Sequence, residues 1–139
     1  EVAPSVTSDD LPYVGVLPAS QTASTLVIPI ESLHVGDTIT GFTVLAQIES
    51  AGGTVTLDAN LRKIVNAAGA PVDSSISSIT QVSVVTDTAV AATKNALDEE
   101  VAASNRYYVL CTATTAAGTS ITMLGVTMIV TEGIVGLDA

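Results

Sequence analysis

Apolar and polar residues alternate along two runs of the segment 41–65, one on each side of Gly52 and Gly53. Alternation with a period of two is typical of a β-strand that has one buried and one exposed face. Two glycines between such runs predict a two-residue hairpin turn, because glycine readily adopts the positive φ that these turns need. Counting outward from the turn places Ile48 opposite Leu57 on the buried face, and a slip of one residue would separate the apolar pairs.

The chain from residue 24 onward consists of short β-branched runs separated by clusters of Gly, Asp, Asn and Ser. This texture predicts an all-β domain, and we expect a jelly-roll-like β-sandwich. Pro29 cannot donate a ladder hydrogen bond, so its strand is expected at a sheet edge or kinked there. The predicted strands are 25–30, 38–49, 54–64, 76–85, 106–115 and 121–131, with a further short strand through Val101.

Three segments depart from this strict alternation. The positions of the last strand expected to face inward change from 121 and 123 to 124, 126, 128 and 130, which predicts a β-bulge near Gly125. Ile39 is likewise out of phase with Phe42, with Gly41 between them. The alanine-rich segment 86–104 has loose apolar spacing, and we expect a long excursion there with at most a short helix.

Residues 1–23 contain three of the five prolines and show no sustained period of 2 or 3.6. They predict an extended N-terminal arm, followed by a β-sandwich domain over residues 24–139. The apolar side chains of the arm would be wasted in water, so we expect the arm to lie across its own domain or a neighbouring subunit. The residues predicted at such a partner interface are Tyr13, Val14, Val16 and Leu17.

Composition supports one globular domain, since 47% of the 139 residues are hydrophobic and 13% are charged. The formal net charge of -10 would repel a phosphate backbone or an anionic membrane surface, so neither nucleic acid nor membrane is an expected partner. The charge also suits a virion or extracellular surface, or a face that docks on a basic partner. Solubility alone explains it more simply.

Cysteine usage and hydropathy narrow the setting further. The single cysteine, Cys111, cannot form an internal disulfide. It lies in an apolar run, where a small buried side chain is expected. The absence of a disulfide framework favours folding in a reducing cytoplasm. The longest apolar run, 121–130, is shorter than the roughly 18 to 20 residues of a membrane-spanning helix.

One histidine raises the question of nucleophilic catalysis. His34 is close to Asp37 in the sequence and serines are abundant, so a Ser-His-Asp arrangement is arithmetically available. However, no serine occupies a G-x-S-x-G motif, which would present it as an activated nucleophile. We therefore interpret His34 as a loop histidine ahead of a turn.

The acidic residues offer two further hypotheses. Asp98, Glu99 and Glu100 could contribute oxygen ligands to a calcium ion, but the spacing of a calcium-binding loop is missing. Glu49 and Asp58 could form the carboxyl pair of a glycosidase, but both fall on the exposed face of the predicted hairpin. A solvated loop and an exposed sheet face explain these acids more simply.

Aromatic side chains, which usually form sugar-binding platforms, make up only 3% of the chain, and there is no tryptophan. Tyr107 and Tyr108 are consecutive in a predicted strand and should point to opposite faces, so one of them is expected at the surface. We predict no catalytic residue, no cofactor and no metal ion, and we expect the protein not to be an enzyme. Binding or assembly remains as the expected role.

Four segments resemble, in texture and order, small β-rich virion proteins of tailed bacteriophages, and in particular the jelly-roll capsid decoration (cement) proteins. In chain order they are TLVIPI, VGDTITGFTV, AGGTVTLDANLRK and YYVLCTATTAAGTSITMLGVTM. The resemblance spans about residues 24–131 and rests on strand order more than on a diagnostic motif.

The resemblance implies a homotrimer that binds the major capsid protein on the outer surface of the virion, after synthesis in the host cytoplasm. Such proteins stabilise the shell without catalysis, and an arm outside the shared pattern would suit contact with a neighbouring subunit. The competing class is a receptor- or glycan-binding module of a phage tail fibre or a bacterial surface protein. A cryptic hydrolase that uses His34 is a third alternative.

Overall fold

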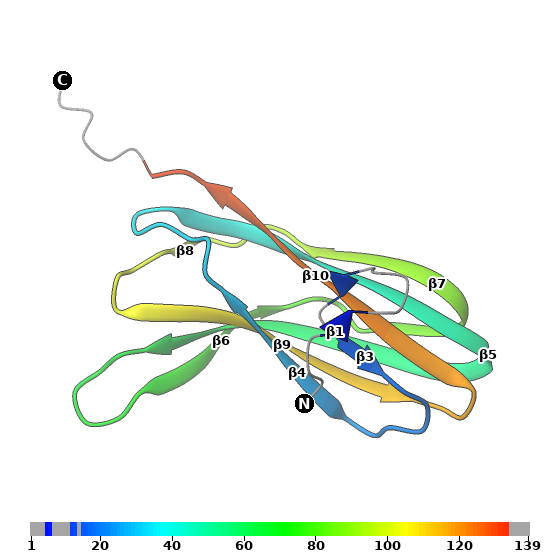
Figure 1. Cartoon of the computed structure of the whole chain (residues 1–139). Coiled ribbons are helices and arrows are strands. Elements are labelled where there is room, and N and C mark those ends of the chain that lie inside the picture. The colour runs from blue at the N-terminus through cyan, green and yellow to red at the C-terminus, as the bar shows by residue number, and fades with distance from the viewer. Residues whose placement is uncertain (1–4, 7–11, 14, 134–139) are drawn as a thin grey trace.

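The computed structural model describes residues 5–6, 12–13 and 15–133, and within these ranges every regular element is a strand (Figure 1). The all-β prediction is therefore confirmed, and no described helix is available to cross a membrane. The strands are β1 (Ser5–Val6), β2 (Pro12–Tyr13), β3 (Gly15–Leu17), β4 (Ser24–Ile30), β5 (Thr38–Val65), β6 (Val72–Ser78), β7 (Val82–Lys94), β8 (Glu99–Glu100), β9 (Asn105–Thr115) and β10 (Thr119–Thr131).

The long strand β5 organises the whole sheet. On one side it pairs with β10 along 38–50 and with β9 along 55–65; on the other side it pairs with β8, β7 and β6 in turn. All of these pairings are antiparallel. β5 lies between β7 on one side and the successive strands β9 and β10 on the other, and these three segments bend together near the middle of β5. β3 extends the sheet beyond β10, and β4 extends it beyond β9.

The bend folds the sheet over itself into a nearly closed, barrel-like arrangement with two facing layers (Figure 1). One layer contains β3, β10, the first half of β5, β8 and most of β7. The other contains β4, β9, the second half of β5, β6 and the start of β7. β4 is an edge strand, as Pro29 predicts.

The predicted hairpin at Gly52 and Gly53 is wrong. Ile48 pairs with Ile121 and Thr88, and Leu57 pairs with two other residues. Because a strand residue can pair with one neighbour on each side, Ile48 and Leu57 cannot pair with each other. Both side chains are nevertheless fully buried. They face the same core from opposite layers, because a regular alternation is compatible with strands that lie side by side and with strands that fold over each other.

The bend needs glycine at two positions for two reasons. Gly52 has a φ of 106°, which side-chain-bearing residues rarely adopt. At Gly53 the limit is space, since a β-carbon there would lie 2.9 Å from the β-carbon of Ala116 and 2.9 Å from Cγ2 of Thr119. The Ser50 hydroxyl donates a hydrogen bond of 2.6 Å to the carbonyl of Gly53 and fastens the bend.

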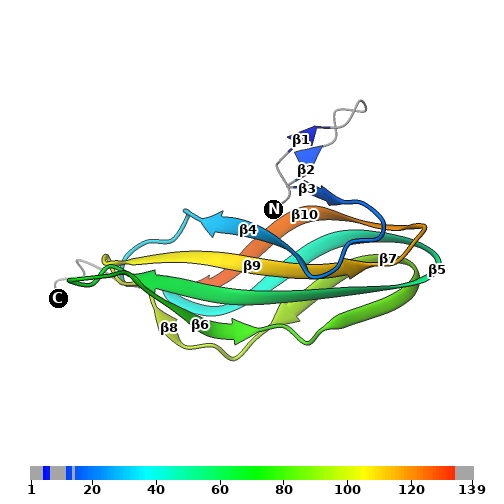
Figure 2. The ribbon, with the colours of Figure 1, turned by 90° about the horizontal axis from the view of Figure 1, so that it is seen from below.

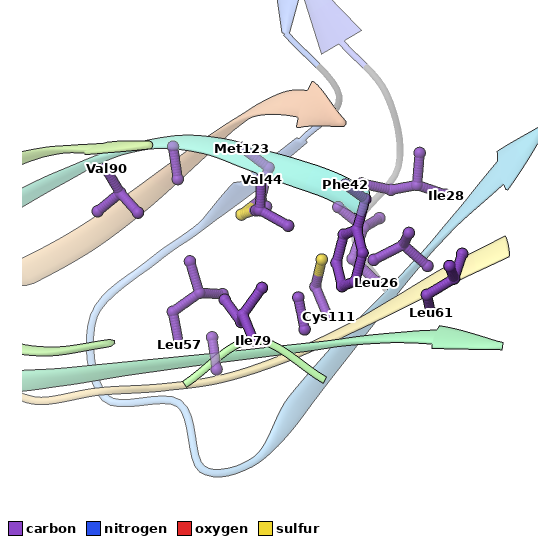
Figure 3. Close-up of a cluster of buried hydrophobic side chains, with 14 of the residues drawn as sticks. Leu26, Ile28, Phe42, Val44, Leu57, Leu61, Ile79, Val90, Cys111 and Met123 are labelled. Atoms are coloured by element: carbon purple, nitrogen blue, oxygen red, sulfur yellow. The ribbon is translucent and has the colours of Figure 1, made fainter. Parts of the chain in front are cut away.

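The core fills the space between the two layers, with Phe42 and Val44 entering it from one layer and Leu57 from the other (Figure 3). Ile39 and Phe42 are both fully buried despite their change of phase, which confirms the irregularity predicted around Gly41. Burying each large aliphatic side chain contributes about 1.5 to 3 kcal/mol. The largest fully buried side chains are Phe42, Ile39, Ile48, Leu57, Leu61, Ile121, Val44, Val55 and Val109.

The β-bulge predicted in the last strand is confirmed, since the register of β10 on β5 shifts between Met123 and Gly125. The inward positions predicted for Leu124 and Val130 are wrong: the bulge turns Leu124 outward and leaves it 49% exposed, and Val130 is 37% exposed. Beyond the bulge Val126 and Met128 pack against the core, as the change of parity predicts.

The segment between β5 and β9 is more regular than predicted. The expected strand 76–85 is divided between β6 and β7, with Ile79 buried between them. The excursion expected over 86–104 is wrong, because β7 continues alongside β5 as far as Lys94. Val90 is buried while Ala89 and Ala91 are exposed, so small residues with weak strand propensity are held in a strand by pairing with β5.

Part of the predicted arm belongs to the sheet. β3 pairs with residues 121–123 of β10, and the following loop is tied to Thr115, whose hydroxyl donates to the carbonyl of Pro18 at 2.6 Å. β1 and β2 form a separate two-stranded sheet (Figure 2). In that view they project from the side of the body that contains β3 and β10.

Candidate functional site

The residues predicted at a partner interface have different environments. Leu17 is only 6% exposed and belongs to the chain's own core. Val16, its neighbour on β3, is half-buried and pairs with Thr122. The backbone of Tyr13 pairs with Ser5 in the small sheet, and Val14 lies outside the described residues. The structure therefore assigns an internal role to Leu17, whereas the contact of the others with a partner stays a prediction.

Sequence reasoning missed a second apolar surface, on β10. We call residues 124–131 the β10 edge, because β3 covers β10 only along 121–123 and no other described strand pairs with its outer side. Leu124, Ile129 and Val130 on this edge are 49%, 39% and 37% exposed. A signal was available in the sequence, since the chain contains no charged residue between Arg106 and Glu132.

The other open strand edges differ in character. β4 contains Pro29, which cannot donate to an added strand. The outer side of β7, which within the described ranges pairs with β5 alone, contains Asp87 and ends at the charged Lys94. Natural sheets commonly protect their edges with proline, charge or β-bulges, and the β10 edge lacks proline and charge but contains the bulge near Gly125.

The His34 and Asp37 pair has a structural geometry. The ring of His34 is 87% exposed, and its Nδ1 lies 3.5 Å from Oδ2 of the nearly buried Asp37. Asp37 accepts hydrogen bonds from the backbone N–H of Gly133 at 3.1 Å and of His34 at 3.2 Å. The bond from Gly133 is the main cause that lowers the pKa of Asp37 below its ordinary value. Within the described ranges no serine is bonded to His34.

Glu99, from the predicted acidic cluster, joins the two layers. Its Oε1 lies 2.6 Å from Nζ of Lys63 on the second half of β5, while β8 itself pairs with the first half. The hydroxyl of the buried Tyr107 lies 3.4 Å from the same oxygen and 3.2 Å from the carbonyl of Glu100. The described part of the chain brings together no three acid, histidine or cysteine side chains that could hold a metal ion.

A second polar cluster joins three neighbouring strands on the outer face. Nη2 of Arg62 on β5 lies 3.1 Å from Oδ2 of Asp73 on β6, and the Tyr108 hydroxyl donates to Oδ1 of Asp73 at 2.8 Å. The hydrogen bonds from Arg62 and then Tyr108 lower the pKa of Asp73, and burial raises the pKa of Tyr108. Tyr107 is buried and Tyr108 faces outward, as the alternation predicts.

The remaining candidate groups do not converge. Glu49 and Asp58 lie on halves of β5 that belong to different layers, and Asp58 accepts a hydrogen bond of 2.7 Å from Gln81. Cys111 is 2% exposed, and burial raises its pKa to about 12, so its thiol is a weak nucleophile at neutral pH. The described polar clusters therefore join neighbouring strands and the two layers of the fold.

Comparison with known proteins provides no family assignment. No protein-family model matches the chain, and neither curated proteins nor solved structures give a significant match.

Proposed function

We propose that the chain is a non-enzymatic virion structural protein that decorates and stabilises a phage capsid through contacts between subunits. The supporting observation is that charged and apolar side chains have different roles. The described ionic clusters are used internally, as Lys63 with Glu99 and Arg62 with Asp73, whereas exposed apolar side chains gather on the β10 edge. Such a molecule offers shape and contact surface to its partners.

The finer points of the proposal come from the resemblance to decoration proteins. The sheet would follow a jelly-roll-like path, the major capsid protein would be the partner, and the molecule would lie on the outer surface of the virion. The resemblance implies three subunits. A buried, unpaired Cys111 is compatible with synthesis in the reducing host cytoplasm.

Removal of the arm tests this proposal. Residues 1–14 can be deleted while keeping β3 and the buried Leu17, which a longer deletion would remove from the core. We expect the truncated protein to fold, to lose most of its affinity for empty capsids of its own virus, and to leave the particle less resistant to heat. A specific interface buries about 1,200 to 2,000 Å², so a projecting arm can supply a large share. Unchanged affinity would argue against a role for the arm.

A receptor- or glycan-binding module is the alternative, and the outward position of Tyr108 is the observation that favours it, since an aromatic ring can stack on a sugar. Its hydroxyl is already bonded to Asp73. Hundreds of copies in purified virions and a silent glycan array would support decoration, whereas tens of copies and glycan binding lost in Tyr108→Ala would support the alternative. Hydrolase activity lost in His34→Ala would contradict both.

A further inference from the structure

The β10 edge presents unpaired backbone groups and exposed apolar side chains together. Along 124–131 the inner side of β10 is bonded to β5, while no described strand covers the outer side. β2 approaches β10, but its ladder is with β1. The stretch 125–129 lies between the two register shifts of β10 on β5 and is regular, and an uncovered edge without proline or charge is a template for an additional strand.

The sequence of this edge is complementary to itself. In an antiparallel pair of two copies centred on Thr127, Val126 lies opposite Met128 on the inward side, where both already pack against the core. On the outward side Ile129 lies opposite Gly125, which has no side chain to obstruct it. The next pair is Leu124 with Val130, and both of these side chains are exposed in the single chain. Apart from the central threonines, these pairs therefore place no polar or charged side chain at the contact.

The distribution of charge also favours a second copy of this chain as the occupant of the β10 edge. Each copy has a formal net charge of -10, so two copies repel each other over most of their surfaces. The stretch between Arg106 and Glu132 is free of charge, and β10 is the part of it that forms an open edge. A basic partner would form no ion pair with an uncharged strand, whereas two copies of this chain repel each other least where their surfaces carry no charge.

We propose that two copies of this chain associate through their β10 edges, in an antiparallel pair about a two-fold axis at Thr127, so that the β10 layers form one continuous sheet. This contact is isologous, since each residue i meets residue j while j meets i. It does not depend on the proposed capsid function and concerns the isolated protein.

Disulfide trapping tests the register. In Thr127→Cys the two new thiols would face each other at the axis, where opposed residues of antiparallel strands have Cα atoms about 4.5 to 5.5 Å apart, within the range of a disulfide. The control is Ala89→Cys, which places an exposed thiol on the open edge of β7. Cys111 is buried and contributes no background. We expect a covalent dimer from the first variant alone; equal cross-linking of both variants would overturn the proposal.

A charge exchange tests the symmetry without relying on oxidation. Thr127→Lys and Thr127→Glu each place like charges opposite each other at the axis, and we expect dimerisation to weaken by about tenfold or more in each. Mixing the two variants should restore the dimer, because Lys then faces Glu. Val85→Lys, at an exposed position on β7, is the control and should leave the dimer unchanged.

Sedimentation and native mass spectrometry measure the oligomeric state of each variant. Thermal melting establishes that each variant is folded. A dimer that is lost in both charge variants and regained in the mixture supports the proposal. A monomer at all concentrations, a trimer, or a failure of the mixture to regain the dimer overturns it. Capsid binding is measured separately, so failure of one proposal leaves the other standing.

Discussion

Asp37 connects the loop before β5 to the end of β10 through one carboxylate. It accepts hydrogen bonds from the backbone N–H groups of His34 and Gly133, which are far apart in the sequence. Hydrogen bonds to the ionised form favour that form, and the pKa of Asp37 is accordingly lower than its ordinary value of about 4. A single charged side chain thus fastens two ends of one layer.

This lowered pKa predicts how stability changes in acid. The folded state binds the proton of Asp37 more weakly than the unfolded state, so its contribution is present above pH about 4 and is lost as the pH falls through the lower, folded-state pKa. In Asp37→Asn we expect lower stability at pH 7 and a smaller further loss between pH about 4 and 2. Urea unfolding over this range measures both.

The control for Asp37 is Asp98→Asn, which changes an exposed carboxyl in a loop. We expect it to leave the stability at pH 7 nearly unchanged. Asp73 also has a lowered pKa, so the Asp37 variant should retain part of the acid loss of the wild-type protein. Parallel pH profiles for wild-type protein and Asp37→Asn would contradict the role given to Asp37.

At the scale of elements, the bend in β5 depends on close approach at Gly53. A β-carbon there would lie 2.9 Å from Ala116 and from Thr119, so Gly53→Ala should destabilise the fold by about 1 to 3 kcal/mol through overpacking. Thr119→Ser removes Cγ2 but keeps the hydroxyl that donates to the carbonyl of Ala116 at 2.9 Å. Denaturant unfolding of the double variant should recover part of the loss. If the losses of stability from the two substitutions are simply additive, the contact with Thr119 is not the reason that position 53 requires glycine.

The Lys63 and Glu99 pair should couple the two layers at the opposite end from this bend. Its side chains are 26% and 17% exposed, so it is better shielded than a surface pair. A double-mutant cycle with Lys63→Met and Glu99→Gln should give a coupling energy of about 1 kcal/mol in unfolding free energy. Lys94→Met, which removes a lysine without a salt bridge among the described residues, should be close to neutral. A coupling near zero would mean that the core alone holds the layers together.

The sequence predicts burial in these elements better than it predicts their neighbours. Alternation along β5 identifies Ile48 and Leu57 as core residues, and both are fully buried. It cannot distinguish a hairpin from a strand that folds over, because the period is two in either case. The bulge near Gly125 was predictable from the change in parity, but the outward turn of Leu124 was not, since an extra residue in a bulge has no fixed side.

The polar clusters show the same limit. Arg62, Asp73 and Tyr108 belong to three strands and meet only through the register of β6 and β9 on β5. No local spacing in the sequence indicates such a contact. The β10 edge is different, because a run without charge is visible in the sequence, although only the sheet order shows that part of this run has an open side.

For the whole molecule, ionic strength separates the two kinds of association proposed. Two bodies of formal charge -10 repel each other, and the Debye length falls from about 30 Å at 0.01 M salt to about 10 Å at 0.1 M. Since the β10 pairing has no ion pair to lose, we expect dimerisation to strengthen as NaCl rises over this range. Binding of the acidic surface to a basic capsid partner should weaken over the same range.

The mixture of Thr127→Lys and Thr127→Glu provides the internal control for this salt prediction. Its single axial charge pair is attractive, so salt should favour it less than it favours the wild-type dimer. Sedimentation equilibrium at several NaCl concentrations measures both. A wild-type dimer that dissociates as salt is added would require ion pairs at the interface, which the uncharged β10 edge cannot provide, and would place the contact on another face of the molecule.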